Sequence, residues 1–385
     1  MHFTIFTLFT SFLWVNFFMF CLIFLVKQTN LYKHFSIYTF LCFIILCILR
    51  LTIVIEFPFT IELDSHYIMT TLQHSMRYVI FSFCVENIKI EICIKHILLT
   101  IWLVGSVLFT FKSFQSCKTI YRLAHFLPET NDESIMKILF TIKNITNFHK
   151  KTKVIVHNKV KSPFIIGYFK PTIMLPELNF TEEEQKGILM HELLHVKYHH
   201  IVLKLMAEII KILFWWNPFV HMFYYNVNNI LECHVDSKLS NLLNKSEQEN
   251  YLNGIIKVIQ NCDLPSQLSF ITSGLASSAK SYDFTEHRFT MILEEVYSKN
   301  KKIKSIILIF STLILFFMSY LFVIQPYGEP TMEDYNDGAI FITDDFYILK
   351  NKDGYTICDP NGIPVKTYSG EIEEKFYYLK VKEEN

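Results

Sequence analysis

Four long apolar runs dominate the hydrophobic pattern of this chain. They cover residues 3–26, 35–57, 92–111 and 305–325. Each run approaches or exceeds the roughly 20 residues that an α-helix needs to cross a bilayer. The pattern therefore predicts a membrane protein with four transmembrane helices. Three of them lie in a membrane region at 1–112, which also holds an external loop at about 58–91.

The stretch between the third and fourth runs, residues 113–300, has the composition and size of one soluble domain. Alternating apolar positions, separated by Pro and Gly, predict three short strands there. The strands lie at 153–157, 164–169 and 172–175. We interpret the last as an edge strand, to which an extended peptide could add.

Helical periodicity takes over after these strands. It predicts a buried or interfacial helix at 201–214, because Lys204, Glu208 and Lys211 recur on one face of an otherwise apolar segment, and a full membrane span is the less favoured alternative. Another helix follows from Pro218 to about Leu243. Residues 244–300 are more polar and irregular, and we predict a flexible connection there.

The tail at 326–385 alternates with the period of β-strands. Its predicted strands lie at 339–343, 346–349 and 376–381, with the hairpin signals Asp353-Gly354 and Asn361-Gly362. This pattern predicts a small all-β C-terminal module.

Composition supports the membrane interpretation, because the chain is 51% hydrophobic and contains 37 Phe but 10 Gly. Its formal net charge is zero, so no polyanionic partner is indicated and direct nucleic-acid binding is not predicted. The distribution of charge says more. Lys27 and Lys33 follow the first run, four lysines between 299 and 304 precede the last, and no Lys or Arg lies between Lys304 and Lys350.

Positive charge therefore gathers on the side of the 113–300 domain. Because positively charged loops stay in the cytosol, the predicted topology is multi-pass with the N-terminus and the tail outside and the domain in the cytosol.

One short motif carries candidate chemistry. His191-Glu192-Leu193-Leu194-His195 is an H-E-x-x-H sequence, and on a helix its two histidines lie one above the other and can share one metal ion. Thr181 and Glu184 fit a capping box that would begin this helix. A catalytic zinc site needs a third protein ligand.

The third ligand is predicted on the next helix. Glu232 can reach the metal, and Asp236, one turn later, can accept a hydrogen bond from the far nitrogen of a ligand histidine. The predicted zinc ligands are thus His191, His195 and Glu232. Glu192 is predicted to be the catalytic base rather than a ligand, since it could take a proton from zinc-bound water.

Together these features resemble the BlaR1/MecR1 family of integral-membrane zinc metallopeptidases, peptidase family M56. The matching motifs occur in one order: Gly167–Pro171 leading to Leu175-Pro176, His191–His195, Trp216–Val220 and Glu232–Asp236. The resemblance covers about residues 1–325 and includes the position of the protease domain between the third and fourth spans.

The resemblance implies a signal transducer of the bacterial plasma membrane with a cytosolic α+β, zincin-like metalloprotease domain. It implies Zn²⁺ held by His191, His195 and Glu232, with Glu192 as the base. It also implies regulated proteolysis, with self-cleavage in the cytosolic loop at about 265–300 and inactivation of a cytosolic transcriptional repressor or another protein substrate. Whether the chain forms a homodimer in the lipid bilayer stays open.

Two features depart from the family. Antibiotic-sensing members carry a large external penicillin-binding domain with an S-x-x-K motif after the last span, whereas the tail here is short and Ser369 has no Lys three residues on. Covalent β-lactam sensing is therefore not expected. The family often has Asp five residues after the second motif histidine, where this chain has His200.

Two alternative functions remain at this stage. The first is a membrane protein-processing or quality-control protease of the M48 type, although the Gly167–Pro171 and Asn217-Pro218 motifs favour M56. The second is a zinc-binding membrane receptor without turnover, against which the intact Glu192 argues. Four histidines near the site are interpreted as packing or surface residues, with donation to an oxyanion as the alternative: His199, His200, His221 and His234.

Overall fold

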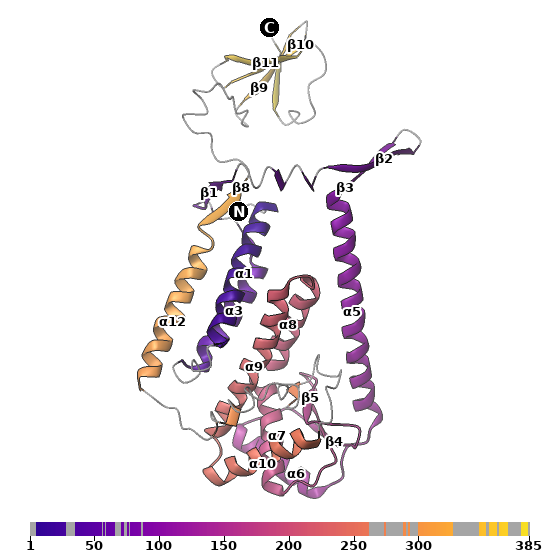
Figure 1. Cartoon of the computed structure of the whole chain (residues 1–385), viewed down its shortest axis with the longest axis vertical. Helices are drawn as coiled ribbons and strands as arrows, with labels where there is room; N and C mark the ends of the chain where they lie inside the picture. Colours follow the sequence, from indigo (N-terminus) through magenta and orange to yellow (C-terminus); the bar gives the residue numbers. More distant parts are fainter. Residues whose placement is uncertain are drawn as a thin grey trace. The chain divides into compact units, whose positions relative to one another are not determined.

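The computed structural model of the chain is predominantly helical with some β-sheet (Figure 1). It describes residues 5–27, 35–55, 57, 59–65, 71–72, 75–76, 78–85, 88–261, 273–274, 288–289, 292, 299–325, 346–351, 354–359, 362–368 and 379–383. The chain divides into two compact units. The first contains residues 1–61 and 73–323, and the second contains residues 62–72 and 324–385.

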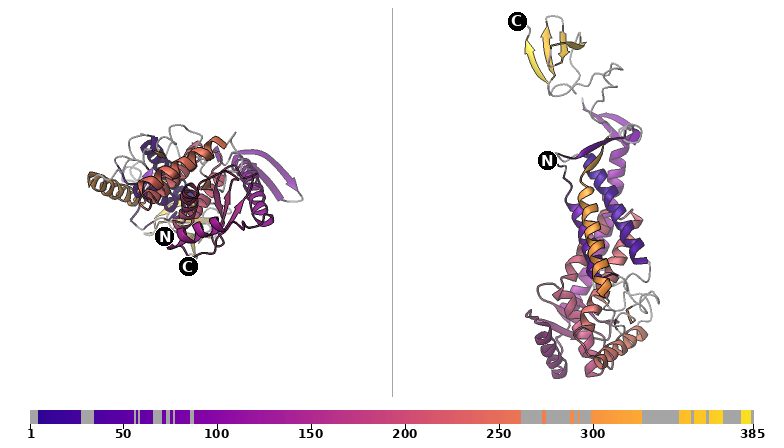
Figure 2. Two further views of the ribbon diagram at one scale, coloured as in Figure 1. Left: turned by 90° about the horizontal axis from the view of Figure 1, so that it is seen from below. Right: turned by 90° about the vertical axis from the view of Figure 1, so that its left-hand side faces the viewer.

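A helical bundle forms one part of the first unit. Its helices are α1 (Ile5–Lys27), α3 (Ile37–Thr52), α8 (His200–Leu213), α9 (Pro218–Ser240) and α12 (Lys299–Met318). They share one hydrophobic core, in which Phe18, Ile44 and Phe223 are almost completely buried. Helix α3 lies beside α1 and beside α12, as their contacts indicate and as can be followed in Figure 2.

Helix α5 (Ile94–Phe126) follows the hairpin of β2 (Val79–Val85) and β3 (Ile88–Cys93) and packs against the end of α8. Trp102 Nε1 donates a hydrogen bond to the carbonyl oxygen of Leu213 at 2.7 Å. A Cβ on Gly105 would overlap the Trp215 indole, so the glycine is what lets the two segments approach. The predicted third span thus continues as a helix well beyond residue 111.

Helices occur at all four predicted spans, but they differ in length and polarity. Two described helical segments are long and apolar enough to cross a membrane, Phe6–Val26 and Ile94–Phe126. The helix Ile37–Thr52 is apolar but shorter, and α12 begins with a lysine-rich turn. A membrane protein is therefore supported, whereas the four-span layout stays a prediction.

The remainder of the first unit is an α+β domain. It consists of α6 (Glu133–Thr146), β4 (Lys153–Val156), β5 (Phe164–Ile166), β6 (Thr172–Leu175), α7 (Glu182–Lys197), α10 (Lys245–Asn261), β7 (Ser273–Gly274) and the C-terminal part of α9. A second core joins the helices to the strands β4, β5 and β6, with Ile142, Ile173, Leu189 and Tyr251 among its fully buried side chains. Part of the stretch predicted to be a flexible connection, 245–261, is thus a helix that packs on α7.

The sheet of this domain has the order β4-β6-β5-β7. Strand β6 pairs with β4 in parallel and with β5 in antiparallel orientation. The prediction that residues 172–175 form an edge strand is therefore wrong, because β6 is hydrogen-bonded on both sides. The outer position next to β5 is held by Ser273–Gly274.

The second unit contains a four-stranded sheet in which three strands pair antiparallel and the fourth pairs in parallel. Its sheet has the order β11-β10-β9-β12, formed by Pro364–Tyr368, Gly354–Cys358, Tyr347–Asn351 and Lys380–Glu383. Ile348, Ile357 and Leu379 form its small core. Gly362, at a φ of +86°, lies in the turn between β10 and β11 where a hairpin was predicted.

Some predictions for the tail fall on residues that the structure does not describe. The predicted strand at 339–343 lies outside the described residues, as do 376–378 of the last predicted strand. Two further strands, β1 (Ile61–Asp64) and β8 (Phe322–Gln325), occur where the sequence passes from one unit to the other.

Candidate metal centre

Helix α7 begins at the predicted capping box. The Thr181 hydroxyl accepts a hydrogen bond from the Glu184 amide at 3.2 Å, and the Glu184 carboxylate accepts one from the Thr181 amide at 2.8 Å. These bonds satisfy two backbone donors that a helix start leaves without partners. The cap sets where α7 begins, and the four-residue spacing of His191 and His195 places both on one face of the helix, where they are fully buried.

Helix α9 supplies the facing residues. Asn217 caps its first turn by accepting a hydrogen bond from the Phe219 amide, and Pro218 occupies the first turn, where a missing N–H costs little. Glu232 and Asp236 follow one turn apart on the buried side of α9. Both carboxylates are fully buried against α7.

The two helices bring His191, His195 and Glu232 together as one group of candidate metal ligands. The Nε2 atoms of the histidines lie 3.2 Å apart. Nε2 of His191 lies 3.2 Å from Glu232 Oε2, and Nε2 of His195 lies 3.4 Å from Oε1. Ligands placed tetrahedrally about 2.05 Å from a zinc ion would be roughly 3.3 Å apart, so the spacing and the His₂Glu donor set fit zinc.

The opposite nitrogen of His191 faces Asp236, as the sequence predicts. Its Nδ1 lies 3.3 Å from Asp236 Oδ1 and 2.8 Å from the Tyr251 hydroxyl, which itself donates to Asp236 at 2.9 Å. Arg288 donates to both oxygens of Asp236, from Nε at 2.6 Å and from Nη2 at 3.0 Å. Asp236, Tyr251 and Arg288 therefore hold the ring of His191 in place.

Glu232 has a cationic partner of its own. Lys204 on α8, which is buried, donates from Nζ to Glu232 Oε1 at 3.1 Å. Arg288 Nη2 lies 3.9 Å from the other oxygen. These cations compensate part of the cost of burying the acids at the site.

The opposite nitrogen of His195 faces another histidine. Its Nδ1 lies 3.1 Å from Nδ1 of His200, the first residue of α8. The Nε2 of His200 lies 2.9 Å from Nδ1 of His234 on α9. His200 and His234 thus form a row of rings that leads away from His195.

The pKa values follow from this environment. Burial lowers the pKa of His195 to about 3 and that of His234 to about 4. Burial opposes ionisation of Asp236, but Arg288 outweighs it and lowers the pKa to about 2. Glu232 is likewise held well below its ordinary pKa against the effect of burial, mainly by Lys204. At neutral pH the site therefore contains ionised carboxylates.

Glu192 is fully buried in the same turn of α7 as His191, and it is not part of the ligand group. The other two histidines considered from the sequence lie elsewhere. His199 contacts the Tyr168 hydroxyl at 2.6 Å, and His221 donates to the Trp215 carbonyl oxygen at 2.8 Å. Neither bond involves a candidate ligand.

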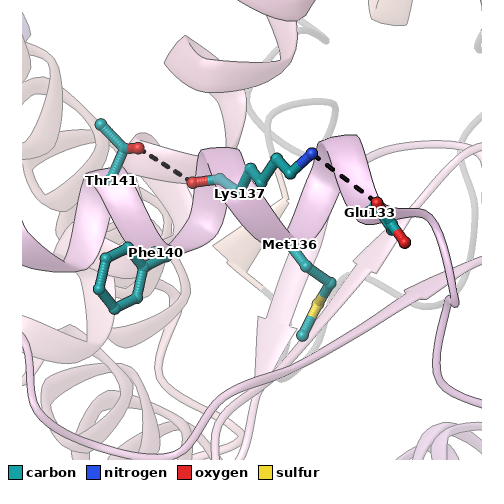
Figure 3. A pocket seen from close by; sticks show the side chains of 5 residues that line it. All are labelled: Glu133, Met136, Lys137, Phe140 and Thr141. Carbon is teal, nitrogen blue, oxygen red and sulfur yellow. Dashed lines mark hydrogen bonds and ion pairs between the residues drawn. The ribbon is translucent and has the colours of Figure 1, made fainter.

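A hollow on the outer face of α6 is separate from this site (Figure 3). It is lined by Glu133, Met136, Lys137, Phe140 and Thr141. Its ion pair, between Lys137 and Glu133, is exposed and 3.7 Å long. The hollow shares no residue with the candidate metal ligands.

Sequence reasoning missed several partners of the ligands. Lys204 was recognised as part of a polar stripe on 201–214, but the stripe does not reveal which residue it faces. Tyr251 and Arg288 lie in a stretch interpreted as a connection, and no local spacing links them to His191 or Asp236. Long-range contacts of this kind carry no periodic signal.

Comparison with known proteins identifies the family of this chain. A family model described as BlaR1 peptidase M56 matches residues 8–292. Regulatory protein BlaR1 of Bacillus licheniformis is 25% identical over 179 residues, covering 46% of this chain and 30% of the relative. Regulatory protein BlaR1 of Staphylococcus aureus is 26% identical over 298 residues, covering 70% of this chain and 49% of the relative.

Methicillin resistance mecR1 protein of Staphylococcus aureus is 26% identical over 170 residues, covering 43% of this chain and 28% of the relative. The chain thus matches less than half the length of these relatives. Because the family model spans most of the chain and includes the candidate ligands, the chain belongs to the BlaR1 peptidase family M56.

Proposed function

We propose that this protein is a membrane-embedded zinc endopeptidase of the BlaR1/MecR1 type that relays an external signal by proteolysis. The observation that carries the proposal is the convergence of His191, His195 and Glu232 at the spacing of a tetrahedral zinc site. Membership of a metallopeptidase family supports a bound metal ion. The His₂Glu donor set favours zinc among the metals.

A zinc ion bound there would supply a water of near-neutral pKa and polarise the scissile carbonyl. We assign Glu192 as the general base, since it adjoins His191 without belonging to the ligand group. It would take the proton from the attacking water and pass it to the leaving amine. Asp236 orients His191 by accepting the hydrogen of its Nδ1, directly or through Tyr251.

Self-cleavage in the segment before α12 is part of the proposal. The strand Ser273–Gly274, from within the predicted cleavage loop at 265–300, pairs antiparallel with β5. Many protein domains bind an extended peptide by adding it as a strand to an exposed sheet edge. The pairing supports the loop as an intramolecular substrate.

The remaining steps of the proposed pathway concern location and partners. We propose four spans, α1, α3, α5 and α12, in the bacterial plasma membrane, with the domain at 113–300 in the cytosol and the tail at 326–385 outside. The charge distribution along the chain supports this orientation. The cytosolic target is then a transcriptional repressor or another protein substrate, as the term regulatory in the names of two relatives suggests.

The Glu192→Gln variant tests the proposal. The change removes the base but keeps the size of the side chain and all three ligands, so zinc should remain at about one ion per chain. Cleavage of the purified full chain in detergent, followed by immunoblot and N-terminal sequencing of the fragments, should be lost. The wild-type chain should yield fragments that map to 265–300.

Two results would contradict the proposal. Unchanged fragments from Glu192→Gln would show that another protease makes the cut. Zinc bound by a wild-type chain that never cleaves itself or a repressor would favour a receptor without turnover. The exposed His149 provides a matched control, because His149→Gln should change neither zinc content nor cleavage.

A further inference from the structure

Three imidazoles lie in a row that starts at a candidate metal ligand. His195 on α7 contacts His200 on α8, Nδ1 to Nδ1, at 3.1 Å, and His200 contacts His234 on α9, Nε2 to Nδ1, at 2.9 Å. All three side chains are buried, with exposed fractions of 0%, 1% and 3%. The row therefore joins three helices inside the protein rather than along its surface.

Each hydrogen bond in the row fixes the next one. Nε2 of His195 faces the other candidate ligands. When Nε2 binds a metal, the ring hydrogen of the neutral His195 must be on Nδ1. Nδ1 of His200 must then accept, so the hydrogen of His200 is on Nε2. His234 accepts that hydrogen at Nδ1, and a single set of neutral tautomers satisfies both contacts.

The surroundings of the row keep it neutral and in place. The ring of His234 packs against Tyr198 and Tyr38, with ring centroids 4.9 and 5.4 Å away. Deep burial favours uncharged imidazoles. The two candidate ligand histidines thus have different neighbours at Nδ1. His191 faces the carboxylate of Asp236, and His195 faces the neutral ring of His200.

We propose that His200, held in one tautomer by His234, is the positioning residue of the ligand His195. By accepting the hydrogen on Nδ1, it turns the Nε2 lone pair of His195 toward the metal position. This inference rests on the proposed function, because it assumes that a metal binds at the cluster. It adds to that function a role for His200 and His234, which no sequence motif identifies as supports of His195.

Zinc affinity of the full chain, measured in detergent by competition with a chromophoric chelator, tests the proposal. His200→Phe keeps a ring but has no acceptor, and loss of such a partner typically weakens metal binding roughly 10- to 100-fold. His200→Asp should restore affinity to about the wild-type level or above, since a carboxylate accepts the same hydrogen. His234→Phe should cause a smaller loss, because His200 remains but its tautomer is no longer fixed.

The outcomes distinguish a failure of the proposed function from a failure of the positioning role of His200. A wild-type chain that binds no zinc would overturn the proposed function. If the wild type binds zinc and His200→Phe binds it equally well, the positioning role is wrong and the proposed function stands. Equal weakening by His200→Phe and His200→Asp would show that ring packing matters rather than the hydrogen bond.

Folding is monitored separately, by thermal unfolding of each variant with excess chelator present. If His200→Phe does not fold, His234→Phe decides, and unchanged zinc affinity in that variant would overturn the proposal. His149→Phe is the matched control, since His149 is exposed in the same domain and should leave zinc affinity unchanged.

Discussion

At the scale of single residues, the candidate centre is a set of buried charges that depend on one another. Asp236 and Glu232 are fully buried, and their cationic partners Arg288 and Lys204 are almost as buried. A buried charge that loses its partner retains the full cost of its removal from water. Arg288 and Lys204 are therefore expected to matter for stability as well as for the proposed metal binding.

Arg288 provides the sharpest test of this dependence. Arg288→Met would remove the two hydrogen bonds that the guanidinium donates to Asp236 and leave that carboxylate buried without its cation. Breaking a buried pair in this way costs about 3–5 kcal/mol. We expect a loss of this size in the free energy of unfolding, measured by denaturant titration of the chelator-treated chain.

A surface pair is the control for Arg288. Lys137 and Glu133 lie 3.7 Å apart, with side chains 79% and 89% exposed. Exposed ion pairs contribute about 0–1 kcal/mol, so Lys137→Met should leave stability nearly unchanged. Similar losses for Arg288→Met and Lys137→Met would contradict the importance of burial.

The sequence predicted the residues whose positions follow from one helix. His191 and His195, like Glu232 and Asp236, are four residues apart, and helical periodicity places each pair on one face. Arg288 lies 52 residues from Asp236 and Tyr251 lies 60 from His191. Contacts of that range depend on how whole elements pack, which residue spacing does not encode.

At the scale of elements, the packing of α7 on α10 sets the position of Tyr251. Gly187 on α7 faces the backbone of Tyr251, and a Cβ there would lie 2.8 Å from its Cβ and 3.2 Å from its Cα. The glycine lets α10 come close enough for the Tyr251 hydroxyl to reach His191.

We expect Gly187→Ala to push the two helices apart. Overpacking of this kind costs about 1–3 kcal/mol, against roughly 1 kcal/mol gained from the better helix propensity of Ala. The displaced Tyr251 would also support His191 less well. Zinc affinity should fall several-fold and the midpoint of thermal unfolding should decrease.

Gly254 on α10 is the matched control in the same helix pair. A Cβ there would meet the end of the Ile188 side chain at 3.1 Å, which can rotate away. Gly254→Ala should therefore be neutral or stabilising by up to about 1 kcal/mol. Equal effects of the two substitutions on unfolding and zinc affinity would show that the close approach of the two helix backbones at Gly187 does not explain the effect of Gly187→Ala.

Other elements show where local patterns were insufficient. The strand 172–175 was predicted with correct limits, but its central place in the sheet depends on pairing with β4 and β5. Helix α10 was missed because its polar face, with Glu247 and Glu249 near its start, outweighed the buried Tyr251, Ile255 and Val258 in the pattern. Tertiary packing decides both cases.

At the scale of the whole molecule, α9 connects the helical bundle with the α+β part of the first unit. Val220, Phe223 and Ile230 belong to the core shared with α1, α3 and α12, whereas Val235 and Leu239 belong to the core of the domain. The candidate ligand Glu232 lies between these two groups on the same helix. A displacement of α9 within the bundle would therefore also move Glu232.

This link carries an external signal only if the chain is oriented as proposed, with the tail outside. Trypsin added to intact protoplasts tests the orientation, because the tail offers Lys350, Lys366, Lys380 and Lys382 as cleavage sites. A C-terminal epitope tag should be lost, while an antibody against 113–300 should still detect a protected fragment. After the membrane is permeabilised, trypsin should degrade that domain as well. Loss of the 113–300 signal before permeabilisation, with the tag retained, would show the opposite orientation and would place the candidate peptidase outside the cell, away from any cytosolic repressor.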